Sequence, residues 1–136
     1  MVRPINLLFL DDKREEISRF RFRLKRYREE NHIPVKLTAT RNVDKVVRLI
    51  NDDGDQYDAF ISDQNLDGRK GYDLIMYLKK EIDKDLIYAI YTAGDIDETL
   101  EERCKANNII LFPKPEYIGF LVREIIKKLP NSSDYD

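Results

Sequence analysis

Polar side chains able to bind a cation or attack an electrophile follow four of the short apolar runs in this chain. Asp11 and Asp12 come directly after the first run, and Asp63 follows the third. Thr92 follows the fourth run, and Lys114 comes shortly after the fifth. Three carboxylates brought together repel one another unless a cation joins them. Their oxygen atoms are the ligands that a hard divalent ion such as Mg²⁺ prefers.

These groups would support phosphoryl transfer if they met at one place. A carboxylate such as Asp63 can attack a phosphoryl group and become an acyl phosphate. Mg²⁺ and Lys114 would stabilise the developing charge, and the Thr92 hydroxyl would donate to a phosphoryl oxygen. Each residue alone has a structural alternative, since aspartates cap helices and lysines lie on surfaces. Their joint placement after strand-like runs favours the chemical interpretation.

Five apolar runs alternate with five segments of helical periodicity, which predicts a repeating strand–helix order. The runs are residues 5–10, 35–40, 57–62, 86–91 and 109–112. The helical stripes begin at Ile17, Val43, Leu74, Ile96 and Ile118. Non-alternating apolar strands joined by crossover helices form a parallel sheet that is covered on both faces. Ligands of such sheets bind beyond the carboxyl ends of the strands, where the polar motifs stand.

The first helical segment is strongly basic in a chain whose formal net charge is −2. Residues 13–28 carry eight basic and two acidic side chains, and arginine alternates with phenylalanine around Phe22. The alternation is typical of a strand, but the length of the segment favours a helix with Phe22 off its buried face. A protein that is acidic overall and has no second basic element is a poor nucleic-acid binder. We therefore expect no direct nucleic-acid binding by this domain.

A chain of 136 residues with 42% hydrophobic and 37% charged residues fits one soluble globular domain. Cys104 is the single cysteine and His32 the single histidine, so neither an internal disulfide nor a zinc site is expected. The apolar run at residues 5–10 is too short for a signal peptide or a membrane helix. We therefore expect a cytoplasmic protein without a membrane partner.

The four motifs, in this order, resemble those of the receiver domains of two-component response regulators. They are Asp11-Asp12, the segment 62–66 with Gly71 downstream, Thr92-Ala93, and the segment 112–115. The resemblance spans residues 5–129. It implies a flavodoxin-like α/β fold, a doubly wound five-stranded parallel sheet of strand order 2-1-3-4-5 with five helices. We expect a receiver domain at residues 1–129 and a polar tail or linker stub at 130–136.

The resemblance implies a role for the acidic residues. Asp63 matches the phosphoacceptor, and Asp11 and Asp12 match the acidic pair that holds Mg²⁺ together with Asp63 and the backbone carbonyl of Asn65. Such a domain is a regulatory switch of a phosphorelay rather than a turnover enzyme, with Mg²⁺ as its cofactor. Its phosphodonor would be a histidine kinase or phosphotransfer protein, for which the basic first helix is a candidate docking surface. The sequence does not identify the output partner or effector domain, and homodimerisation stays open.

The switch and lysine motifs contain both matches and departures. Thr92, followed by Ala93, matches the hydroxyl that moves towards the phosphoryl group, and Lys114 matches the invariant lysine of the family. The bond from that lysine to the next residue, here Pro115, is commonly cis in the family. Leu111 stands where the family often has Tyr or Phe, so an aromatic rotamer switch coupled to Thr92 is not expected there.

Two other functions stay open at this point. A degenerate receiver could act as a phosphorylation-independent binding module, although the acidic set is intact here. A phosphatase of the haloacid dehalogenase type uses similar groups, but its two aspartates are separated by one residue, whereas Asp11 and Asp12 are adjacent. Asp67 stands where many receivers carry proline, which predicts a more flexible and more charged loop at residues 67–71.

Overall fold

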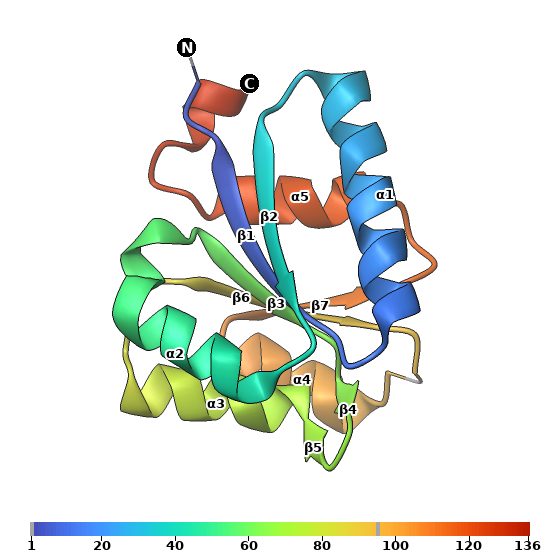
Figure 1. Ribbon diagram of the computed structural model, residues 1–136, viewed down its shortest axis with the longest axis vertical. Coiled ribbons are helices and arrows are strands. Elements are labelled where there is room, and N and C mark those ends of the chain that lie inside the picture. Colours follow the sequence, from blue (N-terminus) through green and yellow to red (C-terminus); the bar gives the residue numbers. More distant parts are fainter. Residues whose placement is uncertain (1, 95) are drawn as a thin grey trace.

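The computed structural model describes residues 2–94 and 96–136 and contains the expected central sheet. Five parallel strands lie in the order β2-β1-β3-β6-β7 (Figure 1). Their bounds are Ile5–Leu10 for β1, Val35–Thr40 for β2, Ala59–Ser62 for β3, Ile87–Thr92 for β6 and Ile109–Pro113 for β7. The strand order is the flavodoxin-like one, so the predicted fold class is confirmed.

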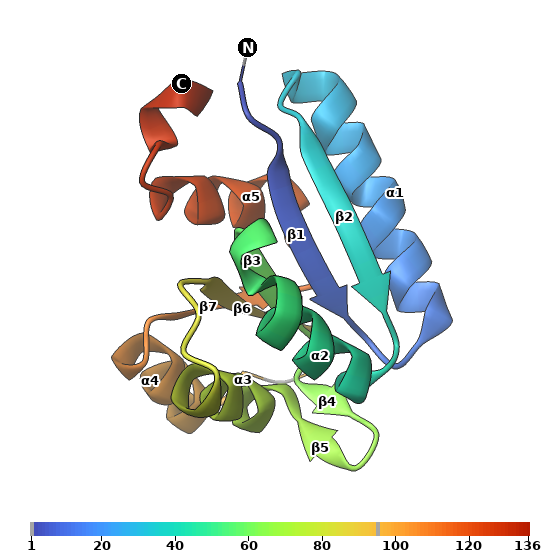
Figure 2. The ribbon, with the colours of Figure 1, turned by 60° about the vertical axis from the view of Figure 1, so that its left-hand side comes forward.

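Five helices cover the two faces of the sheet (Figures 1 and 2). They are α1 (Arg14–Asn31), α2 (Val43–Asp53), α3 (Gly71–Glu81), α4 (Glu98–Ala106) and α5 (Ile118–Lys127). One hydrophobic core joins α1 and α5 to the sheet, and a second joins α2, α3 and α4 to the opposite face. A short 3₁₀ helix, η1 (Gly54–Gln56), follows α2. The doubly wound architecture follows from strands that are apolar on both faces.

Strand β1 shows how the apolar runs serve both cores. Leu7 and Phe9 point into the core under α1 and α5, whereas Leu8 and Leu10 point into the core under α2 and α3. Successive side chains of a strand face opposite sides of the sheet, so a strand with apolar residues on both sides must be covered on both faces. Within α1, the alternating sequence forms a helix, and Phe22 is 61% exposed as the helical interpretation requires.

The segment predicted to be a flexible loop is a small antiparallel hairpin. Strands β4 (Asn65–Leu66) and β5 (Arg69–Lys70) pair with each other across Asp67 and Gly68. Gly68 has a φ of 71°, which glycine adopts without strain, and Asp-Gly is a strong two-residue hairpin signal. The segment is therefore a paired hairpin rather than an open loop, because its turn residues favour pairing, while its flexibility stays a prediction.

The segment at 130–136 lies against the domain rather than apart from it. Residues Ser132–Tyr135 form the 3₁₀ helix η2, and the Tyr135 hydroxyl donates to the carbonyl oxygen of Arg3 at 2.6 Å. The Tyr135 ring packs beside the core under α1 and α5. Figure 1 shows both ends of the chain beside the start of β1, on the side of the molecule away from the hairpin. Within the described residues, no helix has the length and apolarity needed to cross a membrane.

Candidate functional site

Three carboxylates meet beyond the carboxyl ends of β1 and β3. Each of Asp11, Asp12 and Asp63 offers an oxygen that lies within 4.8 Å of the others. Backbone bonds fix this placement, because the Asp11 amide donates to Thr40 and the Asp63 amide donates to Leu10, one residue past each strand end. Asp11 and Asp63 are buried and Asp12 is half-buried. The structure therefore brings the predicted acidic set together.

The donor set fits a divalent cation. Asp11 Oδ1 accepts from the Lys13 amide at 3.0 Å, and Asp12 Oδ2 accepts from the Asp67 amide at 3.1 Å. Asp12 Oδ1 is buried without a hydrogen-bond partner among the described residues. A buried carboxylate oxygen left without a partner costs free energy. A hard cation would join these three oxygen ligands and satisfy that atom.

Lys114 reaches into the same cluster from the end of β7. Its Nζ lies 2.9 Å from Asp11 Oδ2, 3.2 Å from Glu16 Oε2 and 3.6 Å from Asp63 Oδ1. The lysine side chain is only 9% exposed, so these contacts are made with little competing water. Lys114 follows the edge strand β7, whereas Asp11 follows β1 three positions away in the sheet, so this contact joins residues from strands that are not neighbours.

Glu16 is a site residue that the sequence analysis missed. It lies in the first turn of α1, and its second oxygen accepts from Arg19 Nη1 at 2.7 Å. The available signal is positional: Glu16 comes one helical turn after Asp12, and helical side chains tilt towards the helix N-terminus. Within a basic helix, however, that glutamate resembles an ordinary partner for Arg19.

Burial and charge act in opposite directions on the ionisable groups of the site. Burial raises the pKa of Asp63 above its ordinary value, and Asp11 adds to the rise while Lys114 opposes it. Burial works against the charged form of Lys114, but Asp11 and Asp63 outweigh it and raise the pKa of the lysine. Burial likewise opposes ionisation of Glu16, yet Lys114 and Arg19 hold the pKa of that carboxyl below its ordinary value.

The predicted switch hydroxyl is buried at the end of β6. Thr92 Oγ1 accepts from the Gly94 amide at 3.1 Å, and the Thr92 carbonyl accepts from the Lys114 amide at 2.9 Å. This backbone bond fixes the spacing between the hydroxyl and the lysine. Ala93, next in the chain, is exposed at the rim.

The loop after β3 is held tightly around Asp63. The Gln64 amide donates to Asp63 Oδ1 at 2.9 Å, and Ser62 Oγ donates to the Asp63 carbonyl at 2.8 Å. A side chain at Gly71 would collide with that same carbonyl, which explains the glycine of the motif. The Asn65 side chain is exposed and accepts from Lys70 Nζ at 2.7 Å.

The segment around the lysine departs from the expected pattern in one respect. Leu111 packs into the core under α2–α4, while Phe112 stacks on Tyr91 on the other face. The bond from Lys114 to Pro115 is trans, so the cis form implied by the resemblance is not found. The Lys114 carbonyl accepts from Arg23 at 3.0 Å and from the Tyr91 hydroxyl at 3.4 Å, and these donors hold the peptide in its orientation.

Comparison with known structures finds the same fold in receiver domains. The signal receiver domain of a putative Luxo repressor protein from Vibrio parahaemolyticus has a TM-score of 0.73 at 16% identity, over 97% of this chain and 94% of that chain. The HemR receiver domain from Leptospira biflexa has a TM-score of 0.67 at 22% identity, over 95% and 98%. No family model and no curated sequence matches the chain. The chain therefore has the receiver-domain fold.

Proposed function

We propose that residues 1–129 form a phosphoacceptor receiver domain of a two-component or phosphorelay system, with Asp63 as the acceptor. The observation that carries this proposal is the position of Asp63, buried between an acidic pair and the Lys114 ammonium at the carboxyl edge of the sheet. A nucleophilic carboxylate needs both a cation site and a fixed positive charge for phosphoryl transfer. The likeness to solved receiver domains supports the same conclusion.

In the proposed reaction, an oxygen of Asp63 attacks the phosphorus atom of a phosphohistidine or a small acyl phosphate. The bond from phosphorus to the leaving nitrogen or oxygen breaks, and the electron pair leaves with that atom. The product is an acyl phosphate on Asp63. The Lys114 ammonium neutralises charge on the phosphoryl oxygens, and the Thr92 hydroxyl donates a hydrogen bond to one of them.

Mg²⁺ is the proposed cofactor, held by Asp11, Asp12, Asp63 and the backbone carbonyl of Asn65. When bound, it supplies positive charge beside the attacked phosphorus. The hard oxygen donors and the partnerless Asp12 oxygen support a cation at this place. Asp63 must be ionised to attack, and Lys114 favours that state against the effect of burial.

The proposed partners follow from the same chemistry. A histidine kinase or phosphotransfer protein would donate the phosphoryl group in the cytoplasm and dock on α1, whose exposed face is basic and carries Phe22 at 61% exposure. Exposed aromatic and arginine side chains are typical contact residues of protein interfaces. The response would be a change in binding of an output partner or of a second copy, rather than substrate turnover.

The test is the intact mass of the protein after incubation with acetyl phosphate, with and without Mg²⁺. We expect one added phosphoryl group in the wild type, only with Mg²⁺, and none in Asp63→Asn. Asp67→Asn is the matched control, because Asp67 is an exposed neighbour that meets the site through its backbone amide. It should accept the phosphoryl group as the wild type does.

Two outcomes would contradict the proposal. Labelling of Asp63→Asn at the wild-type level would show that another residue accepts the phosphoryl group. Absence of labelling in every protein would favour a phosphorylation-independent binding module. Continuous hydrolysis of an aryl phosphate would instead revive the phosphatase alternative, since a receiver is modified once and does not turn over such substrates.

A further inference from the structure

Helix α1 contributes an acidic group to the surroundings of Lys114 that the proposed reaction does not use. The ammonium is closer to Asp11 and Glu16, at 2.9 and 3.2 Å, than to Asp63 at 3.6 Å. Three carboxylates therefore share one cation. A phosphoryl group arriving on Asp63 would have to draw the ammonium away from Glu16, since both are anionic oxygen acceptors.

The Glu16 carboxylate is held in place for this contact. Arg19 Nη1 binds Oε1 at 2.7 Å, which leaves Oε2 for Lys114 at 3.2 Å. The Glu16 side chain is 19% exposed, whereas Arg19 is 63% exposed. One carboxylate thus bridges a surface cation and a buried one, and Arg19 limits how much of the Glu16 charge acts on Lys114.

The backbone of Lys114 has little freedom to move with its side chain. Arg23 of α1 donates to the Lys114 carbonyl at 3.0 Å and to the Tyr91 hydroxyl at 2.7 Å. The Lys114 amide donates to the Thr92 carbonyl at 2.9 Å. Helix α1 therefore contacts this lysine at its carbonyl through Arg23 and at its ammonium through Glu16. With the backbone held in this way, rotation of the lysine side chain is the simplest way for the ammonium to change partner.

We propose that Glu16 is a positioning residue that retains the Lys114 ammonium and competes for it with the phosphoryl group on Asp63. This inference rests on the proposed function. Glu16 lowers the rate of phosphoryl acceptance, and the strength of its hold on Lys114 is tuned by Arg19. The basic helix is thereby linked to the reactive edge through two side-chain contacts.

The test compares Glu16→Gln with Glu15→Gln. Glu15 is the adjacent, exposed glutamate in the same helical turn, so its variant removes the same charge without removing a contact to Lys114. Glu16 is partly exposed and shares its charge with Arg19, so removing its hold on Lys114 should have an effect of about fivefold, which corresponds to about 1 kcal/mol. We expect Glu16→Gln to accept phosphoryl from acetyl phosphate about fivefold faster than both the wild type and Glu15→Gln.

Two further measurements separate positioning from a merely structural role. The affinity for beryllofluoride, a non-covalent phosphoryl mimic, should rise in Glu16→Gln by a similar factor. Arg19→Gln should change both quantities in the opposite direction, because Glu16 then binds Lys114 with its full charge. Circular dichroism and urea unfolding would show that the variants are folded.

The outcomes are distinguishable from a failure of the proposed function. If the wild type accepts the phosphoryl group but Glu16→Gln and Glu15→Gln behave alike, the inference is wrong and the function stands. The inference is also overturned if Arg19→Gln and Glu16→Gln shift acceptance in the same direction. If the wild type neither accepts the phosphoryl group nor binds beryllofluoride, the proposed function fails, and the inference fails with it.

Discussion

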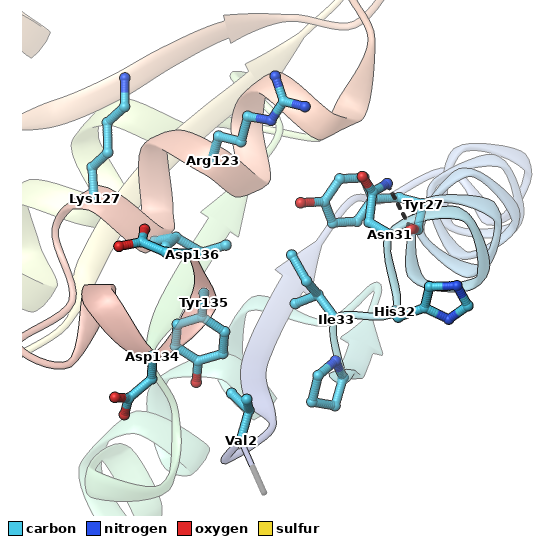
Figure 3. Close-up of a pocket in the computed structure, with 12 residues that line it drawn as sticks. Val2, Tyr27, Asn31, His32, Ile33, Arg123, Lys127, Asp134, Tyr135 and Asp136 are labelled. Carbon is cyan, nitrogen blue, oxygen red and sulfur yellow. Dashed lines mark hydrogen bonds between the residues drawn. The ribbon is translucent and has the colours of Figure 1, made fainter.

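Charged residues are paired differently at the two ends of the strands, which form an amino edge and a carboxyl edge of the sheet. At the edge where the chain begins, Asp58 accepts from Arg3 at 2.8 and 3.2 Å and from the Asn6 amide at 2.8 Å. One cation meets one carboxylate, and both carboxylate oxygens have partners. Tyr135 adds a hydrogen bond to Arg3 in the same region. A pocket of about 500 Å³ is lined by Val2, the neighbour of Arg3, and Figure 3 shows Tyr27, Ile33 and Tyr135 around it together with polar residues.

At the carboxyl edge the charges do not balance. Lys114 is the cation that pairs with Asp11 and Asp63 among the described residues, and it also pairs with Glu16. Asp12 keeps one oxygen without a partner there. The balanced edge ties the chain ends to the sheet. The unbalanced edge has capacity for a cation and a phosphoryl group, at a cost in stability that is common at functional sites.

The largest difference between the two edges is expected when the basic side chain at each is removed. Lys114→Met leaves buried carboxylates without their partner, so we expect a loss of about 3 kcal/mol in unfolding free energy. Phosphoryl acceptance should fall about 100-fold, as when one stabilising donor is removed from a reaction site. The control Arg3→Met removes a half-exposed pair and should cost about 1 kcal/mol without changing acceptance. Urea unfolding measures the stability of the two variants, and mass spectrometry measures their phosphoryl acceptance. Equal losses of stability in Lys114→Met and Arg3→Met would contradict the proposed difference between the edges.

A second comparison uses Mg²⁺ as a stabilising ligand. A site that binds only in the folded state stabilises the protein by about 2.7 kcal/mol when the ion is at 100 times its dissociation constant. We expect Mg²⁺ to raise the melting temperature of the wild type and to have little effect on Asp12→Asn.

Asp58→Asn is the counterpart at the balanced edge. It should lower stability by about 1 kcal/mol, because satisfied hydrogen bonds are lost, and it should keep the full response to Mg²⁺. Thermal unfolding at several Mg²⁺ concentrations tests both variants. An Asp12→Asn protein that responds like the wild type would place the cation elsewhere.

The smallest effect is the pH dependence of stability in metal-free protein. Burial raises the pKa of Asp63 in the folded state, so between its ordinary value of 3.8 and the raised value the folded state binds more protons than the unfolded state. Stability therefore falls as the pH rises through this window, and ionised Asp63 remains destabilising at neutral pH.

Asp63→Asn has no such titration. It should be more stable than the wild type at pH 7 in the presence of a chelator, and the difference should shrink as the pH falls towards 4. Glu16 has the opposite sign, since its lowered pKa gives stability that is lost on acidification. Its contribution is common to both proteins and cancels in the difference. A difference that grows on acidification would contradict the assignment for Asp63.

Several features of the fold could be predicted because they depend on residues close in the chain. The apolar runs and helical stripes predicted the five main strands and the five helices, and the strand ends differ by one or two residues, as at Ala59 and Thr92. The fourth stripe was predicted to begin at Ile96, whereas α4 begins at Glu98. The hairpin at Asn65–Lys70 was missed although Asp67-Gly68 is a recognisable turn. The two strands of this hairpin are too short for a strand pattern to be recognised in the sequence.

The site was predictable in part. Asp11 and Asp63 directly follow the adjacent parallel strands β1 and β3, and the carboxyl ends of parallel strands share one edge, so their convergence follows from the strand order. The contact of Glu16 with Lys114 joins positions far apart in the chain, and no local pattern marks it. The contacts of Arg23 and Tyr91 with the Lys114 carbonyl likewise join remote positions and form only in the folded chain.

The sequence by itself determined which segments are strands and helices, and which polar residues stand at the strand ends. It could do so because hydrophobic periodicity and turn chemistry act over a few residues. The tertiary structure alone decided how the charges are shared: α1 contacts Lys114 at its carbonyl and at its ammonium, and Asp12 keeps an oxygen without a described partner. It also decided that Tyr135 lies beside the core and binds the Arg3 carbonyl. Charge sharing depends on distances between side chains remote in sequence, and these are fixed only when the two cores have packed.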